Sequence, residues 1–124
     1  MSKAKVSIWG RPFELSVIYD KCAGEEVLDS QREAVEAFLG DCPVDRAKSK
    51  VEEYVINHAC AKLSQANIDN IFKYVMPKSI YVLRNSKLGD VAILCNYKFD
   101  MEHGLAIIFG KGKLKVIDTQ DAVL

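Results

Sequence analysis

Short hydrophobic runs bounded by turn-forming residues dominate the second half of the chain. Residues 91–97 and 105–109 are apolar at nearly every position, which is typical of strands buried on both faces. Residues 80–83 form a similar run, and residues 113–116 alternate lysine with an apolar residue. The pattern therefore predicts a four-stranded antiparallel meander in which 91–97 and 105–109 lie centrally. The lysine-bearing run at 113–116 fits an edge or half-exposed strand.

The first half of the chain changes from a two-residue to a helical period. Apolar and polar residues alternate over residues 4–20 on both sides of Gly10-Arg11-Pro12, which predicts a β-hairpin turning at these three residues. From Ser30 onward the period is helical, and the spacing of Ser30 and Glu33 matches a capping box at a helix start.

Two further helices are expected before the meander. Pro43 suits the start of the second helix, because a first-turn residue needs no backbone N–H. Asn67 suits the start of a short third helix, which Pro77 should end. The buried stripe of the second helix is expected to contain Val51, Val55, Ile56, Ala59, Cys60 and Leu63. The expected fold is thus α+β, with an N-terminal β-hairpin, about three helices and then a four-stranded antiparallel meander.

The length of 124 residues predicts one domain, residues 1–124. No apolar stretch approaches the ~20 residues that span a bilayer, and the N-terminal residues lack the apolar segment of a signal peptide. The four cysteines are widely spaced without a C-x-x-C pair, and Cys60 and Cys95 lie within apolar patterns. These features favour reduced thiols and a location in the cytoplasm.

The connection between the two central strands holds the residues most suited to chemistry. Phe99, Asp100, Glu102, His103 and Gly104 place two carboxylates and an imidazole within six positions. His103 could act as a general base oriented by Asp100 or Glu102. Alternatively, the side chains could hydrogen-bond backbone groups and hold the register of the two strands, which is the interpretation we favour.

Other kinds of chemistry have little support in the sequence. Adjacent ligands in one turn rarely surround a metal ion, and no H-x-H, H-E-x-x-H or EF-hand spacing is present. Walker, Rossmann and G-x-S-x-G motifs are missing as well. We therefore expect no metal, no cofactor and no catalytic residue set, so that an enzyme is the less favoured class.

Charge is balanced overall but not along the chain. The 17 basic and 17 acidic residues cancel, so no global basic field predicts nucleic-acid binding, and no membrane partner is expected. Residues 14–53, however, hold 11 acidic and 5 basic residues, a balance of −6. This segment is either a solvated helical layer or a binding face for a basic partner.

The central turn also resembles a known family. Its residues 97–109, followed by Gly112-Lys113-Leu114 and a terminal Gln120-Asp121 with apolar residues after it, are similar to a family of small bacterial domains of unknown function. That family shares an aromatic-Asp-x-Glu-His-Gly-Leu core and a terminal Gln-Asp, and the likeness extends over nearly the whole chain.

The resemblance implies a binding function. Such domains resemble the immunity proteins of polymorphic and contact-dependent toxin systems, which bind and neutralise a cognate bacterial toxin domain in the cytoplasm. The partner implied here is a toxin domain, expected to be basic because the chain has an acidic segment. The residues expected to form the partner-binding face are Glu25, Glu26, Asp29, Glu33 and Glu36. The alternatives are a small enzyme that uses His103, or a regulatory domain.

Overall fold

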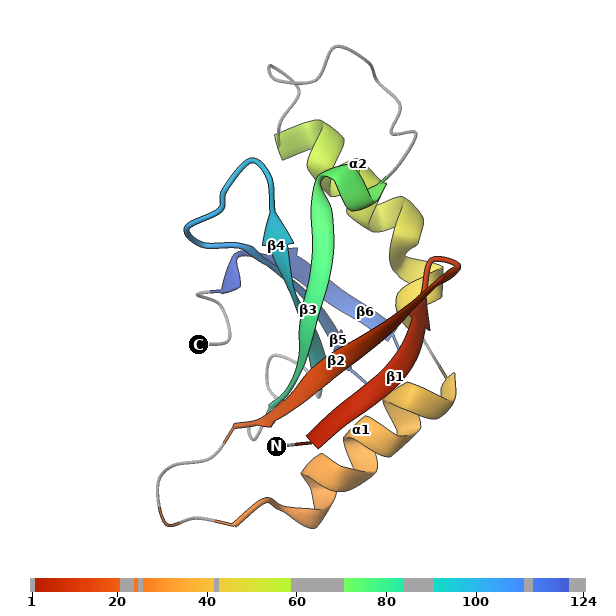
Figure 1. Ribbon diagram of the computed structural model, residues 1–124, viewed down its shortest axis with the longest axis vertical. Helices are drawn as coiled ribbons and strands as arrows, with labels where there is room; N and C mark the ends of the chain where they lie inside the picture. The colour runs from red at the N-terminus through yellow and green to blue at the C-terminus, as the bar shows by residue number, and fades with distance from the viewer. Residues whose placement is uncertain are drawn as a thin grey trace.

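Six strands and two α-helices make up most of the chain in the computed structural model, which describes residues 2–20, 24, 26–41, 43–58, 71–83, 91–110 and 113–120. In chain order the elements are β1 (Ser2–Ile8), β2 (Arg11–Tyr19), α1 (Asp29–Asp41), the 3₁₀ helix η1 (Pro43–Ala47), α2 (Lys48–His58), the 3₁₀ helix η2 (Ile71–Lys73), β3 (Val75–Val82), β4 (Val91–Tyr97), β5 (Leu105–Gly110) and β6 (Lys113–Asp118). Figure 1 shows the strands as one continuous sheet.

The strands follow chain order in a single mixed sheet, β1-β2-β3-β4-β5-β6. All neighbours are antiparallel except β2 and β3, which pair in parallel from Ser16↔Ser79 to Tyr19↔Val82. The expected fold of a hairpin, about three helices and a separate four-stranded meander is therefore wrong. The hairpin joins the other four strands, because the segment between β2 and β3 crosses back and returns the chain in the same direction. The architecture remains a mixture of α and β elements.

The helices also differ from expectation. Residues 43–47 form a 3₁₀ turn before α2 instead of its first turn. The expected third helix is wrong at its C-terminal end, because Ile71–Lys73 is a 3₁₀ turn and β3 begins at Val75. Its start at Asn67, and the expected stripe residues Ala59, Cys60 and Leu63, lie outside the described residues.

Pro77 lies within β3 instead of ending a helix. The pairing of β3 with β4 shifts register between Pro77 and Ser79, so Lys78 is the extra residue of a bulge. A bulge is one of the few places where a strand tolerates a residue without a backbone N–H. Burial of Val75 and Pro77 in the sheet, and their pairing with Tyr97 and Cys95 of β4, thus override the helical spacing of the local sequence.

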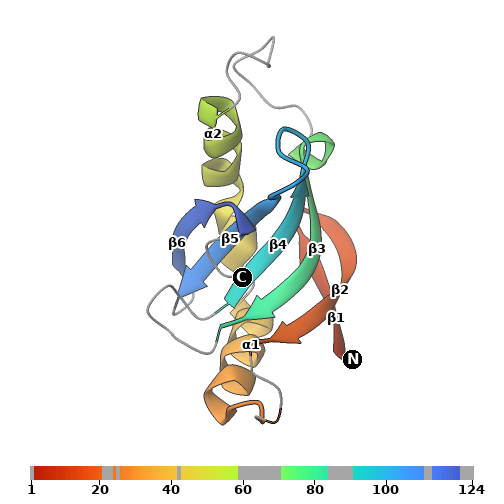
Figure 2. The ribbon, with the colours of Figure 1, turned by 90° about the vertical axis from the view of Figure 1, so that its left-hand side faces the viewer.

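Both helices cover the same face of the sheet (Figures 1 and 2). Val35 and Phe38 of α1 and Val51 and Val55 of α2 are buried in a core with the inward-facing residues of the strands. Phe38 contacts Phe109 of β5, with ring centroids 5.4 Å apart. On the opposite face a second, smaller cluster of buried residues contains Tyr81, Leu83, Ala92, Leu94, Ala106 and Ile108. Strands β4 and β5 therefore contribute to both clusters, which explains their continuous hydrophobic sequences.

A tight turn at Trp9 and Gly10 closes the β1–β2 hairpin. Their φ angles of 53° and 82° are both positive, as in a type I′ turn. The expected turn at Gly10-Arg11-Pro12 is therefore displaced by one residue. Trp9 tolerates this conformation because η1 holds it: its backbone N–H donates to Asp45 Oδ1 at 2.7 Å and its indole N–H to the Val44 carbonyl at 2.8 Å.

Gln31, rather than Ser30 and Glu33, organises the start of α1. Its Oε1 accepts the backbone N–H of Leu28 at 2.9 Å, which is the reciprocal half of a capping box two residues earlier than expected. Its Nε2 donates to the carbonyls of Asp20 at 2.9 Å and Val82 at 3.3 Å. This buried amide therefore ties α1 to the ends of the two parallel strands.

Candidate functional site

Asp100 is the centre of the turn between β4 and β5. Its carboxylate accepts the backbone N–H of His103 at 3.2 Å, and its carbonyl accepts that of Gly104 at 2.8 Å. The Nδ1 atom of His103 lies 3.0 Å from Oδ1 and 3.2 Å from Oδ2 of the same carboxylate. Asp100 thus closes the turn and orients the imidazole.

Glu102 and His103 face solvent. The side chain of His103 is 45% exposed and that of Asp100 27% exposed. Glu102 is also exposed. Among the described contacts, Asp100 rather than Glu102 accepts a backbone N–H of the turn.

Gln120 joins the end of β6 to this turn. Its side-chain Nε2 donates to the Cys95 carbonyl at 2.9 Å, and its backbone N–H donates to the His103 carbonyl at 3.1 Å. Gly104 lies directly beneath it with φ +65°, where a Cβ would meet the Gln120 amide and lie 2.8 Å from the Cys95 carbonyl. The Gly and Gln of the sequence motif are therefore packed against each other, while Asp121 lies outside the described residues.

Phe99 anchors the other side of the turn. Its ring stacks on Tyr74 at 5.4 Å and meets the edge of Tyr97 at 5.7 Å. The backbone N–H of Lys98 donates to the Tyr74 carbonyl at 2.8 Å, and its ammonium lies 5.6 Å from the centre of the Tyr74 ring. The aromatic position of the motif thus fixes the turn to the residue that precedes β3.

Tyr54, Tyr97 and Asp118 lie near the Asp100 carboxylate. Tyr54 of α2 lies 6.4 Å from Tyr97, measured between ring centroids. Burial, followed by the charges of Asp118 and Asp100, raises the pKa of Tyr54. Burial, Tyr54 and Asp100 raise the pKa of Tyr97 to about 12. Sequence analysis missed Tyr54, because only the packing of α2 on the sheet brings it to Asp100, whereas Tyr97 ends the strand that leads into the turn.

The Asp100 carboxylate holds Nδ1 of His103, which would leave Nε2 to accept a proton as a general base. Cys95 is no nucleophile for it, because burial strongly raises the pKa of its thiol. Within the described ranges, no group of three or more His, Cys, Asp or Glu side chains could hold a metal ion. No helix there is long and apolar enough to cross a membrane.

The acidic residues expected to bind a partner lie on and just before α1. Asp29, Glu33 and Glu36 are exposed, as is Glu26, whereas Glu25 lies outside the described residues. The three helical positions have the spacing i, i+4 and i+7, so they form one stripe on the face opposite Val35 and Phe38. We refer to Asp29, Glu33 and Glu36 as the acidic stripe.

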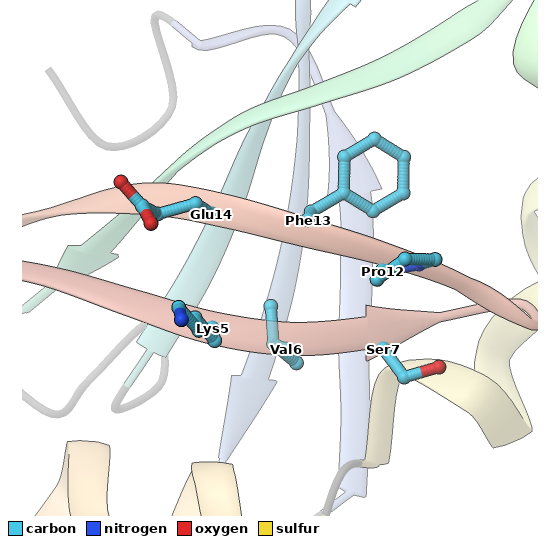
Figure 3. A pocket seen from close by; sticks show the side chains of 6 residues that line it. All are labelled: Lys5, Val6, Ser7, Pro12, Phe13 and Glu14. Atoms are coloured by element: carbon cyan, nitrogen blue, oxygen red, sulfur yellow. The ribbon is translucent and has the colours of Figure 1, made fainter.

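Two surface hollows accompany these features. One, of about 390 Å³, lies on the hairpin and is lined by Lys5, Val6, Ser7, Pro12, Phe13 and Glu14. Figure 3 shows the charged Lys5 and Glu14 at the same end of this hollow, because the two residues are paired across β1 and β2. The other, of about 520 Å³, lies between α2 and β6 and includes Tyr54. We call it the α2–β6 groove.

Together, the mixed sheet and its motif-bearing turn define a small α+β domain. The family described as "Domain of unknown function (DUF6985)" matches residues 2–124, and the chain belongs to this family. This confirms the expected membership of an uncharacterised family. The comparisons with curated proteins and with solved structures gave no match.

Proposed function

We propose that the protein is a binding module of the cytoplasm that recognises a basic protein partner through the acidic stripe of α1, and that it acts as an immunity protein against a bacterial toxin domain. The observation that supports this proposal is the stripe itself. Three exposed carboxylates follow one side of a helix whose other side is buried.

The stripe is unfavourable for the isolated helix. Like charges at i, i+4 destabilise a helix by ~0.2–0.5 kcal/mol for each pair. Asp29 is near Arg32, but this contact of 3.9 Å is highly exposed and contributes little. The last turn of α1 contains no basic residue to offset the acidic ones. Asp29 lies in the first turn, where the helix dipole favours a carboxylate, so the repulsion concerns mainly Glu33 and Glu36, and exposed like charges of this kind suit a surface that binds a basic partner.

Co-purification is the first test. A tagged copy expressed from its native operon should be isolated together with a protein encoded beside it, and mass spectrometry would identify that protein. Isolation of the chain alone, while the neighbouring protein is present in the same cells, would contradict the proposal.

Charge reversal tests the surface. Asp29→Lys, Glu33→Lys and Glu36→Lys combined should slow association with the isolated partner about tenfold or more at low salt, and the difference should shrink at about 0.15 M salt. The matched control compares Glu33→Lys alone with Glu14→Lys, an exposed glutamate of the hairpin, because both have the same change in net charge. If both variants associate equally slowly, net charge rather than the stripe governs binding.

A second candidate function is a small enzyme with His103 as general base. The contact between Asp100 and the Nδ1 of His103 favours it. The two functions differ in what His103→Gln should do. An immunity protein that acts only by binding would still protect cells from the toxin, whereas an enzyme would lose protection while its partner binding stayed intact.

A further inference from the structure

The last strand of the sheet has an open edge. In the strand order, β6 lies at one end and β1 at the other, and Figure 2 shows the two strands at opposite sides of the sheet. The α2–β6 groove runs beside β6. Its lining comprises Lys50, Glu53, Tyr54 and Asn57 of α2 and Leu114, Lys115, Val116 and Ile117 of β6.

The groove follows four consecutive residues of the edge strand β6. The bulge at Lys115 leaves Leu114 and Ile117 both packed against the core that the helices cover, whereas Val116 pairs with Ile108 of the opposite cluster, so residues from both faces border the groove. Residues 113–117 make no backbone hydrogen bond outside the ladder with β5 in the part of the chain that the structure describes. The outward backbone donors and acceptors of β6 thus have no other described backbone partner, and the η1 turn is the neighbour that contacts β6 from the helical layer.

The side chains around this edge are of two kinds. Tyr54, Leu114 and Ile117 are partly buried, and Val116 is 41% exposed, so apolar surface is open to a ligand. Lys113 and Lys115 are exposed and make no ion pair with any described residue. Lys50, in contrast, lies 3.7 Å from Glu53. Asp118, the last residue of β6, is exposed as well and lies near Tyr54, so the two lysines against this one carboxylate leave a balance of +1 along the strand.

We propose that the α2–β6 groove binds an extended acidic segment of a partner protein, which pairs with β6 as a seventh strand and places alternate apolar side chains between β6 and α2. This is strand addition, in which backbone hydrogen bonds give affinity and side-chain pockets give selectivity. The partner's carboxylates would face Lys113 and Lys115.

Two features restrict which segment can bind. Lys115 is the extra residue of a bulge opposite Ile108 and Phe109, and bulges and lysines both discourage indiscriminate pairing at sheet edges. A second copy of this chain would bring its own lysines to the same edge, so repulsion disfavours self-pairing, whereas an acidic strand relieves it. This surface is distinct from the acidic stripe, because α1 and α2 lie at opposite ends of the molecule in Figure 1.

A defined peptide tests the proposal. The probe is an end-capped peptide of about eight residues that alternates valine and glutamate, a usual strand length. Titrated into the isotopically labelled full chain, it should shift the NMR signals of the amides in β6 and of Tyr54 and Asn57, and leave those of β1 unchanged. A peptide with lysine in place of glutamate should not bind.

The chain offers a matched control for charge. Lys113→Glu with Lys115→Glu should weaken peptide binding at least about tenfold, whereas Lys3→Glu with Lys5→Glu, on the opposite edge, should not weaken it. Asn57→Trp adds a bulky side chain at an exposed position of the groove and should block binding while leaving the fold intact. Unchanged melting curves would show that the exposed substitutions act on binding.

Several results would overturn this inference. Absence of shifts at about 1 mM peptide would exclude even weak strand addition. Shifts that map to β1, or equal losses in both lysine variants, would assign the effect to the other edge or to net charge. A dimer that depends on β6 would identify a second copy as the occupant. The variant with Asp29, Glu33 and Glu36 changed to lysine should bind the peptide as the unmodified protein does. This proposal and the proposed function can therefore fail independently.

Discussion

Substitution of Gly104 by alanine would test the packing of the central turn. Gly104 has φ +65°, and an added Cβ would lie 2.8 Å from the Cys95 carbonyl and against the amide of Gln120. The left-handed conformation alone costs an alanine ~1–2 kcal/mol. Gln120 would also have to move, and loss of its hydrogen bond to the buried Cys95 carbonyl would cost a further ~1–3 kcal/mol.

The expected loss is thus about 2–5 kcal/mol in the free energy of unfolding, which lowers the melting temperature by on the order of 10 °C in a domain of this size. Urea unfolding followed by circular dichroism would measure the free-energy change directly. Gly10→Ala is the matched control, because Gly10 has φ +82° but nothing within 4 Å of an added Cβ.

Comparison of the two variants separates backbone strain from the clash. Gly104→Ala should exceed Gly10→Ala by the part due to contact, about 1–3 kcal/mol. In a double-mutant cycle, Gln120→Ala should reduce the additional cost of Gly104→Ala, since the two residues are in contact. Equal losses at Gly104 and Gly10 would refute the proposed role of the Gly104–Gln120 contact.

Three other predictions concern the buried polar groups and the thiol. Gln31→Ala should destabilise the fold by about 1–3 kcal/mol in chemical unfolding, because it orphans the Leu28 N–H and the Asp20 carbonyl, while the Val82 carbonyl keeps the backbone N–H of Asp20. The exposed Arg32→Ala should cost at most about 0.5 kcal/mol. Cys95 should react with iodoacetamide only after unfolding, since burial raises the pKa of its thiol; mass spectrometry that finds it labelled in the native protein would contradict this. Stability should fall as the pH rises from about 10 toward 12, because Tyr97 loses its proton near pH 10 when unfolded and only at about 12 when folded. Tyr97→Phe should flatten that loss, and an unchanged slope would rule out Tyr97 as its source.

Some parts of the structure follow from the local sequence. The continuous apolar runs at 91–97 and 105–109 predicted strands flanked on both sides, and β4 and β5 occupy such positions. The alternation at 113–116 predicted the edge strand that β6 is. Such predictions succeed because the spacing of apolar residues along a strand reports how many of its faces are buried.

Local sequence could not decide how distant elements combine. Val75 has the spacing of a helix with Ile71 and Phe72, yet pairing with Tyr97 makes it a strand. Ser30 and Glu33 had the better capping signal, yet Gln31 organises α1, because only the folded chain brings the Asp20 and Val82 carbonyls to it.

The same limit applies to the candidate site. The sequence by itself determined that Asp100, His103 and Gly104 share a turn between two buried strands. Only the tertiary structure placed Gln120 over that turn, brought Tyr54 to Asp100 and opened a groove between α2 and β6. These contacts depend on the burial of residues far apart in the chain, which local periodicity does not report.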